Sequence, residues 1–264
     1  MDNRLEPMEE YRLSLSQTPY STNAERFQRD VKYGIYSKTD LQILDLLRQY
    51  PVMLVNSINA EYPKGEKLSR AISAMDKLAE TGEVQKLVVK DNLSKTVAIF
   101  IRLNPELAQA LGSIPQPKAT MTDTLRLTAT SQVALELRRE RGMEDWPQIK
   151  YEDGLYYAVV RLYPYMLYVA ALSVGKENEF AYLELLSDKC INSPLQRHIV
   201  FVCTSFDTMY YHANYIFKKA GLHTLSNVYF TFDRAYEVGY SQHMYQAEVD
   251  PNNPDGIVLT QYSI

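Results

Sequence analysis

Four polar side chains on one side of a predicted helix could contact nucleic acid. Residues 64–87 read KGEKLSRAISAMDKLAETGEVQKL, and Gly82 follows the helical pattern as a left-handed cap would require. The apolar residues fall at offsets of 0, 4, 7, 10 and 11, the spacing of an amphipathic helix, and they are Leu68, Ile72, Met75, Leu78 and Ala79. The opposite side carries Lys67, Ser69, Arg70 and Ser73. Cationic and hydroxyl groups of this kind bind phosphates and base edges.

Two lysines stand beside a predicted turn that follows this helix. The runs QKLVVK and TVAIFIRL are apolar and β-branched, and residues 91–94 between them are mostly polar. This pattern predicts a β-hairpin. Lys90 and Lys95 flank its tip, where we expect both ammonium groups to contact phosphates of a nucleic acid.

Carboxylates that could hold Mg²⁺ form an incomplete pattern in the second half of the chain. Residues 152–154, Glu-Asp-Gly, precede a predicted strand, where nucleases of the restriction-enzyme fold place an acid. Those enzymes carry an acid-x-Lys on the following strand, so that two carboxylates hold the metal. Here the following strand, YMLYVAALSV, has neither group, and Lys176 and Glu177 come only at its end in the opposite order. We therefore expect no nuclease activity, with a Mg²⁺-dependent nuclease as the alternative.

No other common catalytic or metal-binding motif is present in the sequence. The phosphate-binding glycine loops, the GxSxG elbow and HExxH are all absent. Two cysteines exclude a disulfide framework and a four-cysteine zinc site. Tyr210 and Tyr211 could serve as strand-nicking nucleophiles, but the histidine cluster that such enzymes need is missing, so tyrosines packed in a core explain them better. His212 is expected to be a packed or surface histidine. The sequence thus predicts no catalytic residue, no metal site and no cofactor.

Composition and charge favour a cytoplasmic protein with a locally basic region. The chain has 264 residues, long enough for two domains, with 46% hydrophobic and 23% charged residues, as in soluble globular proteins. No apolar run reaches the roughly 18 residues of a membrane span, and the N-terminal stretch lacks the apolar segment of a signal peptide. The net charge is −4, but residues 36–103 carry +2 and the remainder −6. A basic face on an acidic protein favours sequence-directed DNA binding over non-specific coating.

The order of predicted elements in residues 36–103 is typical of a winged helix–turn–helix domain. After a polar arm (1–35), Ser37 or Thr39 caps a helix that Pro51 ends, and residues 52–62 form a second helix candidate. The helix described above is the third, and the hairpin follows it. In a winged helix the third helix enters the major groove and the hairpin contacts the flanking backbone. Two alternatives are a winged helix used only for protein contacts and a helical subdomain without a wing.

Residues 122–264 are predicted to form an α/β domain, joined to the first by a proline-containing linker (104–121). A long helix over 122–142 opens it, and its terminal arginines are expected to be solvated. Beyond it lie fifteen of the 21 tyrosines and several β-rich runs. The run HIVFVCTS is continuously apolar, as in a buried central strand. Helical segments follow two of these runs. We expect a mixed sheet flanked by helices.

The sequence resembles the replication-relaxation family of plasmids, phages and conjugative elements over residues 36–235. The resemblance rests on the order of elements, on Asp153-Gly154, and on IVFVCTSFDTMYYHANYIFKKAG, which is similar to the late strand–helix unit of that family. The chain lacks the histidine usual at the start of the long helix and the acidic pair on the second strand. The resemblance implies DNA binding linked to replication, mobilisation or transcription of a mobile element. It also implies that the C-terminal domain has a degenerate restriction-endonuclease-like fold.

Together these patterns predict a protein that binds double-stranded DNA and has a non-catalytic C-terminal domain. One short half-site gives limited specificity, so we expect a dimer or a larger homo-oligomer. The tyrosine-rich C-terminal domain is the expected surface for self-association or for a replication or transfer protein. A protein-interaction adaptor is the remaining alternative, favoured if the C-terminal domain buries the third helix.

Overall fold

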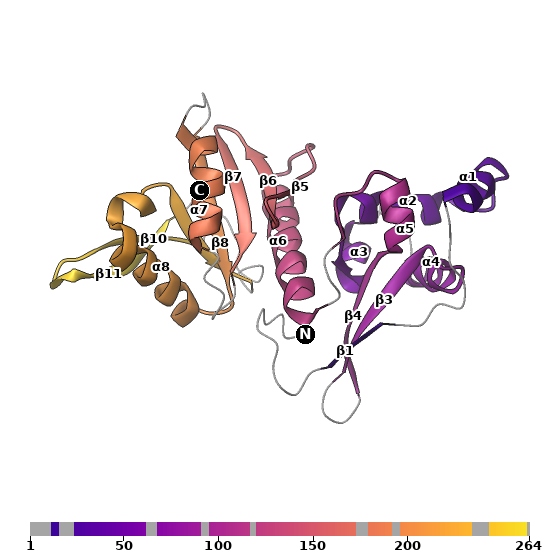
Figure 1. The fold of residues 1–264 in the computed structure, drawn as a ribbon, viewed down its shortest axis with the longest axis horizontal. Helices are drawn as coiled ribbons and strands as arrows, with labels where there is room; N and C mark the ends of the chain where they lie inside the picture. The colour runs from indigo at the N-terminus through magenta and orange to yellow at the C-terminus, as the bar shows by residue number, and fades with distance from the viewer. Residues whose placement is uncertain are drawn as a thin grey trace. The chain divides into compact units, whose positions relative to one another are not determined.

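The computed structural model of the chain (Figure 1) divides into residues 7–124 and residues 125–264, here called unit 1 and unit 2. Unit 1 combines helices with a small sheet, and unit 2 is built on a large mixed sheet, so the fold belongs to the mixed α+β class. The structure describes residues 12–15, 24–61, 68–90, 95–116, 120–172, 179–191, 196–233 and 243–262.

Unit 1 contains the three helices and the hairpin expected in residues 36–103. In chain order the elements are α2 (Lys38–Gln49), β2 (Met53–Leu54), α3 (Val55–Glu61), α4 (Leu68–Glu80), β3 (Val84–Lys90) and β4 (Thr96–Leu103). A capping box starts α2. The Ser37 side chain accepts a hydrogen bond from the Asp40 backbone N–H, and the Asp40 carboxylate accepts one from the Ser37 backbone N–H. The second predicted helix is shorter than expected, since β2 takes up its first residues by pairing with β4.

The sheet of unit 1 is antiparallel, with the order β1-β3-β4-β2. Its main pair is the β3–β4 hairpin, which confirms the predicted hairpin and aligns Lys90 with Thr96 at its tip. Within residues 1–35, which were predicted to be a loosely ordered arm that docks partly on the body, the structure describes a strand and a helix. β1 (Arg12–Leu15) pairs with β3, and α1 (Ala24–Lys32) packs near α5 (Pro105–Ala110). A short strand stabilised by a distant partner leaves no local pattern in the sequence.

The buried side of α4 does not include Ile72 of the predicted stripe. Its buried residues are Ala71, Ala74, Met75, Leu78 and Ala79, whereas Ile72 is 40% exposed. Successive residues of a helix are turned by about 100°, so Ile72 falls at the border of the face centred on Ala71 and Met75. The prediction that Ile72 belongs to the core was therefore wrong.

Unit 2 is a seven-stranded sheet with the order β11-β10-β9-β8-β7-β6-β5. The strands β5, β6 and β7 form an antiparallel meander, β7, β8 and β9 are parallel, and β10 and β11 close the far side as a hairpin. Their bounds are Gln148–Glu152, Leu155–Leu162, Tyr165–Ala171, Gln196–Cys203, Val228–Phe232, Met244–Asp250 and Asn253–Tyr262. The predicted mixed sheet with HIVFVCTS in a central strand is confirmed. No sequence pattern had indicated β5, β10 or β11.

Helices connect the parallel strands and cover the sheet. In the chain, α7 (Glu179–Ile191) connects β7 to β8, and α8 (Phe206–Ala220) follows β8 (Figure 1). Leu186 of α7 and Ile216 of α8 share one buried cluster with Phe201 and Phe230 of the strands. The long helix α6 (Met121–Glu140), predicted over 122–142, leads into unit 2. Its Thr130 hydroxyl accepts from the backbone N–H of Ala171 at 3.1 Å, which fixes α6 to the end of β7.

Candidate nucleic-acid interface

The outer side of α4 presents two of the four predicted contact residues to solvent. Arg70 and Ser73 are both exposed, and their spacing of three places them on the same face of the helix. Lys67 lies outside the described residues, as does the side chain of Ser69. Within unit 1 this face of α4 is therefore accessible, as the predicted role requires.

An ion pair links α4 to α2. The Lys77 Nζ lies 2.8 Å from Oδ2 of Asp40, whose side chain is almost completely buried. The same carboxylate caps α2 through the Ser37 backbone N–H, also at 2.8 Å. Lys77 therefore contributes to the packing of α4 on α2, and the exposed Arg70 and Ser73 lie nearer the N-terminus of α4.

Glu83, in the turn between α4 and β3, ties that turn to the rest of unit 1. Its fully buried carboxylate accepts hydrogen bonds from the Tyr36 hydroxyl at 2.8 Å, from Arg26 at 3.4 Å and from the Thr81 hydroxyl. Burial and the Glu83 carboxylate together raise the pKa of Tyr36 far above its ordinary value. The Glu83 carbonyl also accepts from the Asn104 backbone N–H at 2.8 Å, next to α5. This network links the turn before the hairpin to α1, to Tyr36 and to the start of α5.

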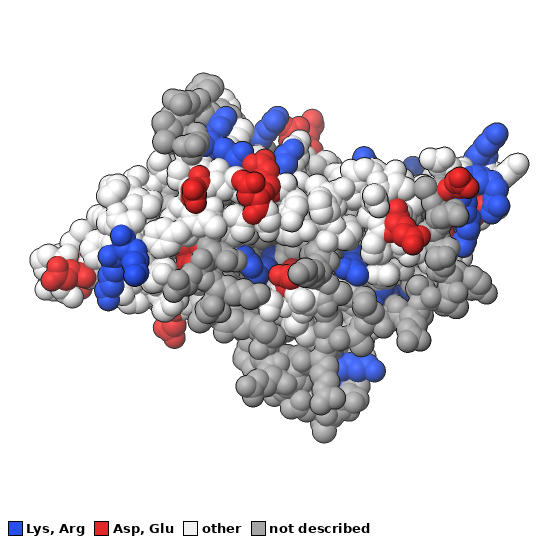
Figure 2. Space-filling model, viewed as in Figure 1, with Lys and Arg blue, Asp and Glu red and all other residues white. Residues whose placement is uncertain are grey.

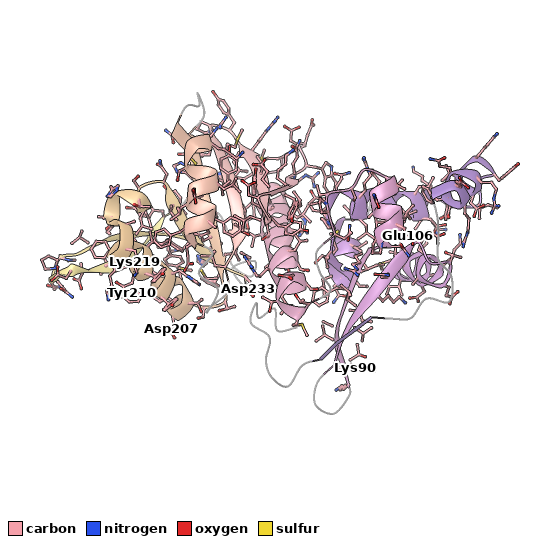
Figure 3. The ribbon with its side chains drawn as sticks, in the orientation of Figure 1. Lys90, Glu106, Asp207, Tyr210, Lys219 and Asp233 are labelled. Atoms are coloured by element: carbon pink, nitrogen blue, oxygen red, sulfur yellow. The ribbon has the colours of Figure 1, made fainter. Side chains whose placement is uncertain are left out.

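The two predicted hairpin lysines are exposed and close to the tip. Lys90 ends β3 and Lys95 precedes β4, and residues 91–94 between them lie outside the described part of the chain. Figure 3 labels Lys90 at this end of the hairpin. Near its base, Lys86 forms an ion pair with Asp76 of α4, so the hairpin and the helix are linked by charge as well as by the chain. The structure thus brings the predicted α4 and hairpin residues into one unit.

Charge of one sign does not dominate the face shown in Figure 2. Lysine and arginine side chains (blue) are interspersed with aspartate and glutamate (red) among the described residues of that view. The whole chain is acidic, with a net charge of −4. Such a surface favours contact through a few placed cations over a broad polyanion-binding patch.

The residues considered for nuclease chemistry do not assemble into a metal site in the described part of the chain. Asp153 is exposed at the β5–β6 turn with a φ of 49°, while Glu152 lies 2.8 Å from Lys189 of α7. Lys189, followed by the Tyr157 hydroxyl, lowers the pKa of Glu152. Lys176 and Glu177 lie outside the described residues. No group of three His, Cys, Asp or Glu side chains that could hold a metal occurs among the described residues.

A buried pair in unit 2 has no counterpart in the sequence predictions. His212 of α8 is 1% exposed, and its Nδ1 contacts Oε1 of Glu179, the first residue of α7. The outer atoms of the pair, Glu179 Oε2 and His212 Nε2, are buried without a hydrogen-bond partner. Cys203 at the end of β8 is completely buried, and its surroundings raise the pKa of its thiol, with the Glu179 charge adding to the effect of burial. No spacing rule connects positions 179 and 212, so only the fold reveals this cluster.

Asp233, directly after β9, is a second buried acid at this end of the parallel strands (Figure 3). Burial raises the pKa of its carboxyl to about 8, against the opposing effect of a backbone hydrogen bond. Its backbone N–H donates to the Cys203 carbonyl at 3.0 Å, which extends the β8–β9 ladder.

The prediction of core positions for Tyr210 and Tyr211 was wrong, because these α8 side chains are 40% and 45% exposed.

Comparisons with protein-family models, with curated proteins and with solved structures find no match for the chain. Within the described residues, no helix is both long enough and apolar enough to cross a membrane.

Proposed function

We propose that the chain binds double-stranded DNA through unit 1, acting as a winged helix–turn–helix domain. The observation that carries the proposal is the antiparallel β3–β4 hairpin directly after α4, with its exposed lysines at the tip. The order α2-β2-α3-α4-β3-β4 and the pairing of β2 and β3 with opposite edges of β4 agree with a winged helix. In that arrangement α4 is the helix that enters the major groove.

Each predicted contact residue has a distinct task in this proposal. Arg70 hydrogen-bonds to a guanine edge, and Ser69 and Ser73 contact bases or phosphates from the same half of α4. Lys67, Lys90 and Lys95 bind phosphates, as do lysines generally in DNA complexes. Because α4 offers one arginine and two hydroxyls for base contacts, a second copy of the chain on an adjacent half-site supplies the remaining specificity.

Unit 2 acts, in this proposal, as a non-catalytic domain for self-association or for a replication or transfer protein. The order α6-β5-β6-β7-α7-β8 agrees with a degenerate restriction-endonuclease-like fold. Two observations support the absence of nuclease activity. Glu152 forms an ion pair with Lys189, and β7 ends in alanines where a nuclease needs an acidic residue. The resemblance to the replication-relaxation family suggests replication, mobilisation or transcription of a mobile element as the process.

The salt dependence of DNA binding in a hairpin double variant tests the proposal. A duplex target is first selected from random DNA with the whole protein. Replacing Lys90 and Lys95 by alanine should weaken binding to all sequences, and the slope of log K against log salt should become shallower by about 0.9 for each phosphate that the variant no longer neutralises. Lys32→Ala, at an exposed position in the last turn of α1, removes a charge away from the hairpin and should leave the slope unchanged.

Two results would contradict the proposal in different ways. A wild-type protein without affinity for any duplex would favour the adaptor alternative, in which unit 1 contacts a protein. Equal slopes for the wild type and the double variant would show that the hairpin does not contact the DNA backbone.

A further inference from the structure

Four strands form the edges of the two sheets, and β11 differs from the other three. The edges in unit 1, β1 and β2, have four and two residues. At one edge of unit 2, β5 has five residues and carries Lys150 and Glu152. Short or charged edges hinder pairing with another chain. By contrast, β11 has ten residues and is the longest described strand, and its segment 256–262 contains no charged residue and no proline. Among the described residues β11 pairs with β10 alone, so its other side can accept a further strand.

Unit 2 holds β11 in place on both faces of the sheet. On one face, the hydroxyl groups of Thr260 and Tyr262 donate hydrogen bonds to the Glu248 carboxylate of β10. On the other face, Ile257 is buried and Leu259 packs against the cluster that includes residues of α8. The register of β11 with β10 is regular outside the hairpin tip. The strand is therefore already extended and ordered, as a template for an added strand requires.

Exposed aromatic side chains of α8 lie on the side of the helix toward this edge. Phe206 is 50% exposed, and its ring packs against that of Tyr245 of β10 with 5.7 Å between the centres. Tyr210, labelled in Figure 3, is 40% exposed and follows one turn later on the same side. The opposite side of α8, about 180° from Phe206, carries Tyr215. Tyr215 contacts Phe180 of α7. Because α8 also contacts β11, the side with Phe206 and Tyr210 faces the β10–β11 hairpin.

An uncharged edge beside exposed aromatic rings fits a second copy of the same surface. Two identical strands related by a twofold axis pair antiparallel, and each copy then contributes the same patch. An axis perpendicular to the sheet keeps both α8 helices on one face, so the aromatic side chains of the two copies flank the junction together. The segment 256–262 has no charge that would repel its own copy, and it offers no counter-charge to a charged partner. Pairing also satisfies backbone groups at the edge and removes apolar surface from water.

We infer that two copies of the chain associate through β11, which joins their two sheets into one, with Phe206 and Tyr210 beside the junction. This inference rests on the proposed function, which assigns self-association to unit 2, and deepens it by naming the surface and the partner. The pairing supplies the second copy that a target with two half-sites requires.

The dissociation constant of the dimer, measured by sedimentation equilibrium of the whole chain without DNA from about 1 to 100 μM, tests the inference. Val258→Lys adds a charge to the edge strand, as natural proteins do to prevent such pairing. The register places this position opposite Glu248, so the new ammonium group favours the fold of the single copy. Tyr210→Lys adds a charge beside the junction. Each substitution occurs twice in the dimer, so each should raise the dissociation constant by about tenfold or more.

Tyr211→Lys is the matched control for the α8 variant. Tyr211 is on the same helix and is 45% exposed, close to the 40% of Tyr210. It lies about 100° further round the helix, away from Phe206. This control variant should keep the dissociation constant of the wild type.

Amide hydrogen exchange locates the contact within the dimer. Exchange in residues 257–262 should slow when the protein concentration rises above the dissociation constant, because the outer amides of β11 become paired. Exchange in β5, at the other edge of the same sheet, should not change with concentration.

Several results would overturn the inference. These are a monomeric wild type over the whole concentration range, a dimer that forms with unchanged exchange in β11, and equal dissociation constants for Tyr210→Lys and Tyr211→Lys. A folded Val258→Lys variant that dimerises as well as the wild type would also overturn it. If circular dichroism shows that this variant does not fold, the two tyrosine variants decide.

The same measurements separate the inference from DNA binding by unit 1. A monomeric wild type, together with a shallower salt slope for the Lys90 and Lys95 double variant, would leave the DNA-binding proposal standing and the inference wrong. A dimer with protected β11 that binds no duplex would leave the inference standing and contradict DNA binding.

Discussion

Replacing Asp233 by asparagine should remove much of the pH dependence of unit 2 stability. The carboxyl is buried after β9, where its pKa is raised to about 8. In the unfolded chain the same group ionises near its ordinary value of about 3.9. Between these values the folded state therefore holds a proton that the unfolded state has released.

The sign and size of the effect follow from this difference. Because the folded pKa is raised, the stabilising contribution is complete below about pH 4 and is lost as the pH rises toward 8. In that window the free energy of unfolding falls by about 1.4 kcal/mol per pH unit, or about 2.7 kcal/mol from pH 5 to pH 7. Asparagine binds no proton, so Asp233→Asn should lack this part of the slope.

Trp146 provides the assay, because it is the single tryptophan of the chain and lies in unit 2, with the Arg138 guanidinium 3.9 Å from its ring centre. Urea unfolding followed by its fluorescence at pH 5, 6 and 7 gives the free energy of unfolding of this unit. The comparison uses the change with pH in each protein, so any constant cost of the amide cancels. Parallel pH profiles for the wild type and Asp233→Asn would refute the assignment of a retained proton to Asp233.

Four further outcomes are expected. Glu83→Ala should lower the free energy of unfolding of unit 1 by roughly 3–5 kcal/mol, because it disrupts a buried network. Tyr36→Phe removes only the hydroxyl that donates to Glu83 and should cost about 1–3 kcal/mol. Urea unfolding followed by circular dichroism measures both. Arg70→Ala should cost about 1–3 kcal/mol of binding and relax base preference at one position, which titration against single-base variants of the selected duplex would show. The purified protein with Mg²⁺ or Mn²⁺ should leave plasmid DNA uncut, and cleavage abolished by Asp153→Ala would contradict the non-catalytic role of unit 2.

The sequence predicted those elements whose stabilising pattern is local. The periodic spacing around Met75 indicated α4, the β-branched runs indicated the β3–β4 hairpin, and the apolar run ending at Cys203 indicated a central strand. The border position of Ile72 was assigned wrongly because an apolar type alone does not fix the centre of a helical face. The exposed tyrosines of α8 show the same limit, since an aromatic type does not specify burial.

Contacts between residues far apart in the sequence could not be predicted from local patterns. β1 has four residues and depends on a ladder with β3, so no local periodicity indicated it. The Glu179–His212 pair joins the start of one helix to the middle of another, and Glu83 receives its donors from α1, from Tyr36 and from its own turn. For the candidate interface, the sequence indicated which residue types could bind DNA, whereas the accessibility of Arg70, Ser73 and Lys90 required the fold.

The strand order of unit 2 has a consequence for how the chain folds during synthesis. Each strand from β5 to β11 lies beside its neighbour in the chain, so each pairing closes either a hairpin or one strand–helix–strand segment, and such local pairings form faster than distant ones. Unit 2 can therefore add one strand at a time as the polypeptide emerges from the ribosome. β1 is the opposite case, since Leu15 is synthesised long before its partner Leu87. Until β1 docks, the outer edge of β3 is open to strands of other nascent chains, and docking closes that route to aggregation.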